Sequence, residues 1–251
     1  MVHGLIFAAG LGTRLKPLTD TMPKALVPLA GKPLLQWQVE KLRDAGITDI
    51  IVNVHHFPDQ IIEAVKANNG WGCNILISDE RDLLLDTGGG LRKAMQLLSP
   101  LASRPSPIIA CNVDILSNID LRALINEYNH QSSLLVVSER QTQRYLCFDD
   151  QGRMQGWTNI ATGEIKGQDG RHLAFSGLQI LSPEILSRLD EMPESKFSLI
   201  DFYLHLCEQN QKSKIENQKS ILRAYVPENY RMMDVGKIDQ LSEAERFAES
   251  L

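Results

Sequence analysis

The sequence predicts an α/β fold, because short apolar runs typical of buried strands alternate with stretches whose apolar residues recur at helical spacing. Strand, helix and strand follow one another closely, which indicates parallel pairs with right-handed crossovers. From Tyr145 to His172 the pattern changes to short apolar stretches separated by turn-like residues. We therefore expect a Rossmann-like sheet, mixed but mainly parallel and flanked by helices, with a small antiparallel β insert over its ligand edge.

The first half of the chain provides most of the strands and helices. Leu5–Ala9 is typical of a buried strand, and it ends abruptly at Gly10. After a long loop, a helix is expected from Pro33 to Gly46, because proline suits the start of a helix and glycine its C-terminal cap. Similar criteria predict the strands Ile50–Val54, Asn74–Ser78, Pro107–Cys111 and Leu134–Val137, and the helices Pro58–Ala67, Leu91–Leu98 and Asp120–Tyr128.

The second half begins with the insert and ends with helices. Hairpins are expected where Leu146–Phe148 and Met154–Trp157 alternate with the turn-like stretches Asp149–Gly152 and Ala161–Gly163. The remaining pattern predicts the helices Pro183–Leu189, Leu199–Glu208 and Ile238–Phe247, and the strand Arg223–Val226.

Composition and charge exclude several classes of protein. The 251 residues contain no linker, low-complexity tract or fixed-period repeat, so we expect a single domain over residues 1–251. The 31 acidic residues outnumber 26 dispersed Lys and Arg, which disfavours a basic nucleic-acid-binding face. No apolar run approaches the roughly 18 residues that a membrane helix needs, and no signal peptide is visible. The protein is expected to be cytoplasmic, with no membrane partner.

Cysteine and histidine spacing gives no metal site. Cys73, Cys111, Cys147 and Cys207 lie far apart in the sequence, and we expect buried thiols in a reducing compartment. The pair His55-His56 lacks a third ligand at metal-like spacing, so a loop or packing role is expected for it.

The loop after the first strand is the richest in chemistry. Gly10 and Gly12 allow a tight turn whose N–H groups can approach an anion. A dinucleotide-binding loop would need a third glycine, and an NTPase phosphate loop would need Gly-Lys-Ser/Thr. Pro17, Pro23 and Pro28 instead favour an extended, wrapping loop. Together with the cations Arg14 and Lys24, this loop predicts a triphosphate clamp.

These residues resemble the signature of the sugar-phosphate nucleotidyltransferases, also called NDP-sugar pyrophosphorylases. The resemblance rests on Gly10-Leu11-Gly12-Thr13-Arg14, Pro17, Thr19, Pro23-Lys24, Leu26-Val27-Pro28 and Gly31-Lys32-Pro33. The resemblance implies an Mg²⁺-dependent reaction in which a sugar 1-phosphate attacks the α-phosphate of a nucleoside triphosphate and releases pyrophosphate. Arg14 would hold the departing phosphates, and Lys24 would draw the two reacting phosphates together.

The metal ligands implied by the resemblance are two aspartates. Asn112-Val113-Asp114 resembles the family's Asn-Gly-Asp element, although Val113 replaces the usual glycine. Asp234, in Asp234-Val235-Gly236, resembles the second ligand. Both would bind Mg²⁺, which prefers carboxylate and phosphate oxygens. The alternative for each aspartate is a turn or helix-capping role.

The nucleotide would lie in the first half of the domain, about residues 1–130. Three consecutive glycines after Asp86-Thr87 favour a flat slot for a nucleobase, with a helix-entry turn as the alternative. The nucleotide-binding candidates are Ala8, Ala9, Gly10, Gly12, Thr13, Thr87, Gly88, Gly89 and Asn112.

The sugar phosphate would lie in the second half, about residues 131–251. The family commonly has an adjacent Glu-Lys pair, whereas Ile165 separates Glu164 from Lys166 here, and a one-residue offset turns a strand side chain to the other face. The element Phe175-Ser176-Gly177 matches better. The sugar-phosphate candidates are Asn159, Glu164, Lys166, Ser176 and Gly177.

Two alternatives remain open. One is a cytidylyltransferase for a non-sugar phosphate such as phosphocholine, and the other is a non-catalytic nucleotide-sensing subunit of the same fold. Because the chain is short, we expect no C-terminal acyltransferase domain. In length the chain resembles family members that make GDP-sugars from mannose or heptose phosphates, or UDP-activated muramic acid, as cell-surface polysaccharide precursors. Neither base nor sugar follows from the sequence. Members of the family are often dimers or tetramers, so a homo-oligomer is possible.

Overall fold

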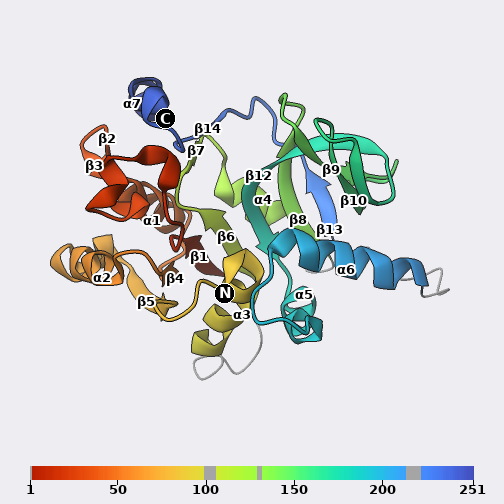
Figure 1. Ribbon diagram of the computed structural model, residues 1–251, viewed down its shortest axis with the longest axis horizontal. Coiled ribbons are helices and arrows are strands. Elements are labelled where there is room, and N and C mark those ends of the chain that lie inside the picture. Colours follow the sequence, from red (N-terminus) through yellow and green to blue (C-terminus); the bar gives the residue numbers. More distant parts are fainter. Residues whose placement is uncertain (1, 99–105, 129–131, 213–221) are drawn as a thin grey trace.

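One large sheet runs through the centre of the computed structural model, which describes residues 2–98, 106–128, 132–212 and 222–251 (Figure 1). Four neighbouring strands are parallel, in the spatial order β6 (Ile108–Asn112), β1 (His3–Phe7), β4 (Asp49–Val54) and β5 (Asn74–Asp79). Each connection between consecutive strands of this set contains a helix. The predicted α/β fold with a mixed, mainly parallel sheet is confirmed.

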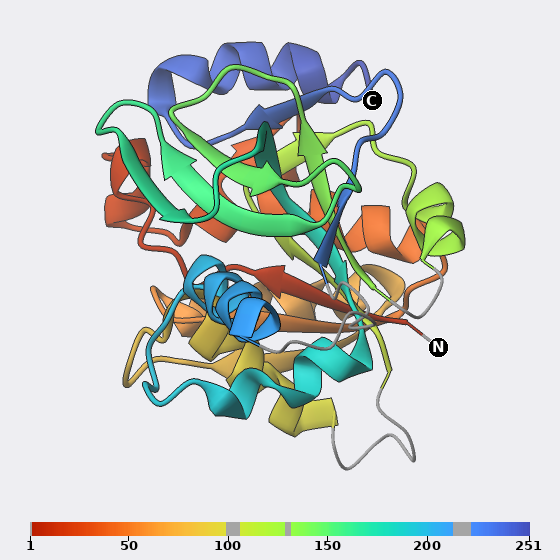
Figure 2. The same ribbon diagram turned by 90° about the vertical axis from the view of Figure 1, so that its right-hand side faces the viewer.

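Beyond β6 the sheet becomes antiparallel. β12 (Arg171–Leu181) pairs with β6 and then extends to pair with β8 (Ser133–Ser138) and β9 (Arg144–Phe148). β10 (Met154–Asn159) and β11 (Glu164–Gly167) continue from β9 as hairpins, and β13 (Leu222–Tyr225) lies parallel to β8. In Figure 2 the green strands of this region lie above the red strand β1. β9, β10 and β11 form the antiparallel hairpins predicted between Tyr145 and His172.

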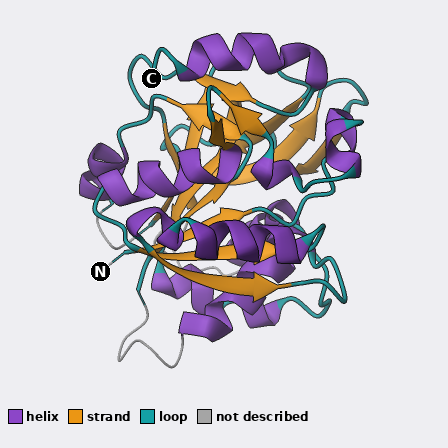
Figure 3. Ribbon diagram, turned by 90° about the vertical axis from the view of Figure 1, so that its left-hand side faces the viewer, coloured by secondary structure: helices purple, strands orange, loops and turns teal. Residues whose placement is uncertain are grey.

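Helices cover both faces of the sheet (Figure 3). Adjacent residues of β1 face opposite sides, so Ile6 and Leu5 belong to two different apolar clusters. The cluster around Ile6 is covered by α1 (Leu34–Asp44), α2 (Pro58–Ala67), α4 (Leu121–Glu127) and α7 (Leu241–Ala248). The cluster around Leu5 is covered by α3 (Asp86–Leu98), α5 (Pro183–Ser187) and α6 (Leu199–Lys212). Within the described ranges, the structure contains no helix with both the length and the apolar character needed to cross a bilayer.

The opening loop differs from the extended conformation that its prolines predict. It contains three single 3₁₀ turns, Thr13–Leu15, Leu18–Asp20 and Lys24–Leu26, followed by the short hairpin of β2 (Pro28–Leu29) and β3 (Lys32–Pro33). Leu15 and Ala25 are fully buried. Burying these side chains requires the loop to fold back onto the core, which an extended chain would not achieve.

The alternative considered for the three glycines, a turn before a helix, is wrong, because α3 already begins at Asp86 and contains them. A Cβ atom on Gly88 would lie 2.4 Å from ring carbons of Phe197, and one on Gly89 would lie 2.3 Å from the carbonyl oxygen of Ser195. Both glycine N–H groups donate to the Phe197 carbonyl, at 2.9 and 3.1 Å. The glycines therefore let the first turn of α3 pack against the segment before α6.

A separate antiparallel ribbon joins the middle of the chain to its C-terminal part. β7 (Ile115–Ser117) follows β6 after a tight turn and pairs with β14 (Met232–Asp234). The ribbon brings β14 next to the carboxyl end of β6. The predicted division of the domain near residue 130 lies outside the described residues.

Candidate active site

A cavity of about 460 Å³ lies where the parallel strands end. Open α/β sheets bind their ligands at this edge, because the loops that leave the strands converge there. Three sets of segments line the cavity: the end of β1 with the glycine loop, the ends of β4, β5 and β6, and the start of α3. The lining residues include Ala8, Ala9, Gly10, Gly12, Thr13, Arg14, Lys24, Asn53, Glu80, Asp86, Thr87, Asn112, Asp114, Lys196 and Gly236.

The glycine loop is held in place by contacts between its own residues. Gly12 has φ +64°, and a Cβ atom there would lie 2.8 Å from the methyl carbon of Thr19. The Thr19 hydroxyl donates to the Gly12 carbonyl at 2.8 Å. A position with positive φ and no room for a side chain requires glycine. Gly10 has no heavy atom within 4 Å of an added Cβ, so this part of the loop faces open space.

The N–H of Ala8 is not available to a ligand. It donates to Asn53 Oδ1 at 2.7 Å, at the buried end of the cavity. Since this bond uses the only backbone donor of Ala8, any contact from this residue to a bound nucleotide must come from its carbonyl or its methyl group.

A buried pair of polar side chains lies behind that amide. Asn53 Nδ2 donates to Glu80 Oε1 at 2.8 Å, and the N–H of Leu85 donates to Glu80 Oε2 at 3.1 Å. Glu80 is only 1% exposed, and burial raises its pKa above the usual range. A Cβ atom on Gly90 would lie 2.8 Å from Glu80 Oε1, so the third glycine of the run makes room for this pair. The network joins β1, β4, the loop after β5 and α3.

Two ion pairs join the cations of the glycine loop to the two candidate metal ligands. Lys24 Nζ contacts Asp114 Oδ2, and this lysine side chain is 9% exposed. Arg14 Nη2 lies 3.7 Å from Asp234 Oδ2, and both of these side chains are about half exposed. A Cβ atom on Gly236 would lie 2.6 Å from both Arg14 Nη2 and Asp234 Oδ1, so glycine here leaves room for the Arg14 pair.

The β7–β14 ribbon brings the two aspartates together from positions 120 residues apart in the sequence. Asp234 pairs across the ribbon with Ile115, the residue after Asp114. The N–H of Val235 donates to the Asp114 carbonyl at 2.8 Å. Two carboxylates on adjoining strand ends fit a hard divalent cation such as Mg²⁺, which binds oxygen ligands.

A second cavity, of about 320 Å³, adjoins the first and shares Asn112 with it. Gly177 has φ +71°, and a Cβ atom there would lie 2.6 Å from Asn112 Nδ2. Ser176 is buried and its hydroxyl donates to the Val136 carbonyl at 2.8 Å, which holds β12 against β8. Arg140 also lines this cavity and donates to the Phe175 carbonyl at 3.0 Å. Asp234 lines this cavity as well, whereas Asp114 lines the larger one, so each cavity has one of the two aspartates in its lining.

Five of the candidate residues lie outside the linings of these two cavities. Gly88 and Gly89 pack against the segment before α6, as described above. Asn159 accepts a hydrogen bond from the N–H of Ala161 at 3.1 Å and so forms a turn. Glu164 and Lys166 pair with each other on β11 at 3.6 Å, and the Lys166 ammonium lies 5.5 Å from the centre of the Trp157 ring. Lys166 lines a different cavity, against α6.

Among the polar side chains that line the cavities, sequence reasoning did not single out Asn53, Glu80, Arg140 and Lys196. Asn53 offered one signal, because it is the only polar residue in the predicted buried strand Ile50–Val54. A polar side chain at such a position needs a hydrogen-bond partner. The other three lie in loops, where charged residues are ordinary.

A cluster with metal-ligand chemistry lies elsewhere, on β12 and the insert. The described part of the chain brings three potential ligands together, Cys147, Asp169 and His172. His172 Nε2 lies 2.6 Å from Asp169 Oδ1. Burial raises the pKa of Cys147 to about 12, which opposes the thiolate that a metal would need. The cluster is therefore best explained by hydrogen bonding within the insert.

Comparison with known proteins identifies relatives over the whole chain. The family model described as nucleotidyl transferase matches residues 3–250. The chain is 30% identical over 252 residues to the N-acetylmuramate alpha-1-phosphate uridylyltransferase of Neisseria meningitidis serogroup B, covering 98% of each protein. The enzyme of that name from Caulobacter vibrioides is 31% identical over 211 residues, which cover 80% of this chain and 83% of the relative.

Other relatives match part of their own length or share only the fold. The mannose-1-phosphate guanyltransferase of Schizosaccharomyces pombe is 31% identical over 77% of this chain and 53% of its own length. Among solved structures, HddC from Yersinia pseudotuberculosis complexed with GMP-PN has a TM-score of 0.72 at 24% identity, covering 99% of this chain and 100% of that one. An apo UDP-glucose pyrophosphorylase has a TM-score of 0.75 at 20% identity, with complete coverage of both chains.

Proposed function

The chain belongs to the nucleotidyl transferase family, and we propose that it couples a nucleoside triphosphate to a sugar 1-phosphate, giving an NDP-sugar and pyrophosphate. An oxygen of the sugar 1-phosphate attacks the α-phosphorus, and the bond from that phosphorus to the bridging oxygen of the pyrophosphate breaks in line. Because the attacking phosphate is already an anion, the step needs no general base. Catalysis then depends on positioning and on neutralising negative charge.

The observation that carries this proposal is the meeting of two cations and two carboxylates where the two cavities join. Lys24 is buried beside Asp114 and close to the glycine loop, a position suited to neutralising the attacking phosphate and the α-phosphate. Arg14 is more exposed, on the same loop, and would hold the β- and γ-phosphates as they leave. Bringing two phosphates into contact is the main electrostatic cost of the reaction, and both cations lower it.

Asp114 and Asp234 would hold Mg²⁺ when it is bound. The cation would supply further neutralisation of phosphate charge. Lys24 and Arg14 lie beside these carboxylates and form ion pairs with them, so cations and metal ligands share one end of the site.

For the substrates, two relatives that match over most of their own length favour UTP and N-acetylmuramate α-1-phosphate. Two uridylyltransferases with that specificity in their names match at least 80% of this chain and at least 83% of their own length. The guanyltransferases match 77% of this chain but only about half of their own length. The sugar would occupy the smaller cavity, where Gly177 and Arg140 lie.

The test is pyrophosphate release with Mg²⁺ across a grid of nucleoside triphosphates against sugar 1-phosphates, with phosphocholine included as an acceptor. We expect one strong combination, with UTP and N-acetylmuramate α-1-phosphate as the first to be measured. Activity with phosphocholine alone would assign the chain to the non-sugar cytidylyltransferases. Nucleotide binding without turnover anywhere in the grid would contradict a catalytic role.

Two variants test the residues. Lys24→Ala and Asp114→Asn are expected to lower kcat by about 10²–10³-fold, the usual effect of losing one fixed stabilising group at a charged transition state. The matched controls are Lys16→Ala and Asp20→Asn, because these residues form an exposed ion pair of 3.0 Å in the same loop and lie outside the cavity lining. Near-normal turnover of Lys24→Ala would refute the role proposed for this lysine.

A further inference from the structure

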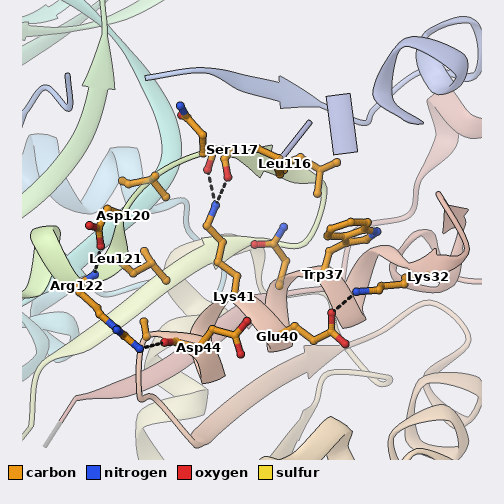
Figure 4. Close-up of a pocket in the computed structure, with 15 residues that line it drawn as sticks. Lys32, Trp37, Glu40, Lys41, Asp44, Leu116, Ser117, Asp120, Leu121 and Arg122 are labelled. Atoms are coloured by element: carbon orange, nitrogen blue, oxygen red, sulfur yellow. Dashed lines mark hydrogen bonds and ion pairs between the residues drawn. The ribbon is translucent and has the colours of Figure 1, made fainter. Parts of the chain in front are cut away.

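Outside the candidate active site, a larger cavity of about 570 Å³ lies between α1, β7 and the start of α4 (Figure 4). Its lining combines apolar side chains, such as Trp37, Leu116 and Leu121, with charged ones. In Figure 4 the Lys41 side chain rises from α1 into the middle of this group and points toward Ser117. We name this space the α1–β7 cavity. It is large enough for a small metabolite.

Lys41 carries its charge here without a carboxylate partner. Its ammonium donates to the carbonyl of Ser117 at 2.5 Å and to the hydroxyl of Ser117 at 2.7 Å. Among the described residues, no carboxylate lies within ion-pair distance of it. Burial lowers the pKa of Lys41 to about 8, as expected for a partly desolvated ammonium with neutral partners. An anion from solution would supply the missing counter-charge.

Arg122 is a second cation of this kind. Its guanidinium donates to the backbone carbonyl of Asp44 at 2.5 Å, and in the described ranges it too has no carboxylate within ion-pair distance. Arg122 is exposed at the edge of the cavity, so most of its donors remain accessible to a ligand.

The acidic residues of the lining already have partners. Glu40 pairs with Lys32 at 2.6 Å, and the Asp44 carboxylate pairs with Arg43 at 3.0 Å. The Asp120 carboxylate accepts the N–H groups of Arg122 and Ala123, at 2.8 and 3.0 Å, as the cap of α4. The formal charges of these lining side chains balance. Among the described residues of the lining, however, Lys41 and Arg122 are cations without a carboxylate partner. This distribution favours an anionic group at those two residues.

The contacts of Lys41 lead to the candidate metal ligands. Lys41 and Gln38 lie one turn apart on α1, and both bond to β7, Gln38 through the Ile115 carbonyl at 2.8 Å. β7 begins directly after Asp114, and Ile115 is the cross-strand partner of Asp234. The same strand therefore carries the α1–β7 cavity on one side and the paired aspartates at its start.

We propose that the α1–β7 cavity binds a small metabolite through phosphate or carboxylate groups that contact Lys41 inside the cavity and Arg122 at its edge, and that binding changes the activity of the site at Asp114 and Asp234. An anion at Lys41 competes with Ser117 for the ammonium and so alters how α1 holds β7. The carbon skeleton of the ligand would lie against Trp37, Leu116 and Leu121. The effect on activity rests on the proposed function, whereas the binding does not.

The test is calorimetry with inorganic phosphate and with citrate as probes of the two anion classes. We expect a dissociation constant below about 10 mM for at least one probe, raised at least tenfold in Lys41→Met and severalfold in Arg122→Gln. Lys16→Ala is the matched control for removing a lysine, and Lys24→Ala removes the cation of the candidate active site. Both should leave this binding unchanged. The probe that binds more tightly identifies the anion class.

Several results would overturn the proposal. One is the absence of binding for both probes in the wild type, and another is equal binding in wild type and Lys41→Met. Loss of binding in Lys24→Ala with full binding in Lys41→Met would place the anion in the nucleotide cavity instead. If Lys41→Met does not fold, Arg122→Gln is the deciding variant, because Arg122 is exposed and its replacement should leave the fold intact. Unchanged anion binding in Arg122→Gln would then contradict the proposed site.

The regulatory part is tested separately by pyrophosphate release. The tighter-binding probe should change kcat or KM at least twofold in the wild type, and this change should disappear in Lys41→Met. Binding without any change in turnover would retain the site and reject the coupling. A chain with no turnover at all would refute the proposed function and leave the calorimetry intact.

Discussion

The polar pair behind the nucleotide cavity provides the sharpest prediction of stability. Asn53 connects the N–H of Ala8 to the carboxylate of Glu80, and all three residues are at least 98% buried. Replacing Asn53 by Ala leaves the Ala8 N–H without a partner and removes one donor from a buried carboxylate. Leaving a buried donor unpaired costs about 1–3 kcal/mol, and a hydrogen bond to a charged group is worth about 1.5–3 kcal/mol. We expect Asn53→Ala to lower the free energy of unfolding by roughly 3–5 kcal/mol.

The measurement is urea unfolding followed by circular dichroism, with a thermal melt as a second readout. For a chain of about this size, each kcal/mol shifts the melting temperature by about 2–4 °C, so a fall of roughly 6–20 °C is expected. Asn118→Ala is the matched control. Asn118 also makes two hydrogen bonds, donating to the Asn229 carbonyl at 3.0 Å and accepting from the Arg231 N–H at 2.7 Å, but it is exposed.

In the control, water can replace the lost hydrogen bonds, so the expected loss is below about 1 kcal/mol. Equal losses in Asn53→Ala and Asn118→Ala, or a loss below about 1 kcal/mol in both, would refute the reasoning. The result would then mean that Ala8 and Glu80 find water or other partners when the asparagine is removed.

Three further outcomes follow from the structure. Gly89→Ala should lower the melting temperature although alanine is the better helix former by about 1 kcal/mol, because its Cβ would lie 2.3 Å from the Ser195 carbonyl oxygen; Gly10→Ala, with open space around it, should melt like the wild type. Because the folded-state pKa of Lys41 is lowered to about 8, the folded protein binds fewer protons than the unfolded chain between about pH 8 and 10.5. The stability of the wild type relative to Lys41→Met should therefore rise across that range in urea titrations without added anions, and a falling difference would contradict the pKa shift. Thr87→Val should weaken α6 by about 1 kcal/mol in the same unfolding assay, since the Thr87 hydroxyl accepts the first N–H of that helix at 3.0 Å; an unchanged value would show that this bond adds nothing.

The chain's local patterns were sufficient to predict most of its elements. Strand β1 and helices α1 and α2 follow directly from short-range periodicity, with Pro33 and Pro58 at the helix starts. Such patterns depend on the burial of neighbouring residues on one face, which nearby sequence encodes. The glycine loop could be recognised for the same reason. Its defining residues, Gly12 with its positive φ and the cations Arg14 and Lys24, all lie within 15 consecutive residues.

What only the tertiary structure decided involves residues far apart in the chain. The bond from Ala8 to Asn53 spans 45 residues, and the pairing of Asp114 with the region of Asp234 spans 120. Gly88 and Gly89 were candidates for a base slot, but their lack of side chains is required by the segment at residues 195–197. Glu164 and Lys166 were candidates for sugar binding, but on β11 they pair with each other and lie outside the linings of the two active-site cavities. Local sequence determines which face of an element is buried, but the partner that covers this face depends on how all the elements pack. For this reason the full set of site residues could not be predicted from motifs alone.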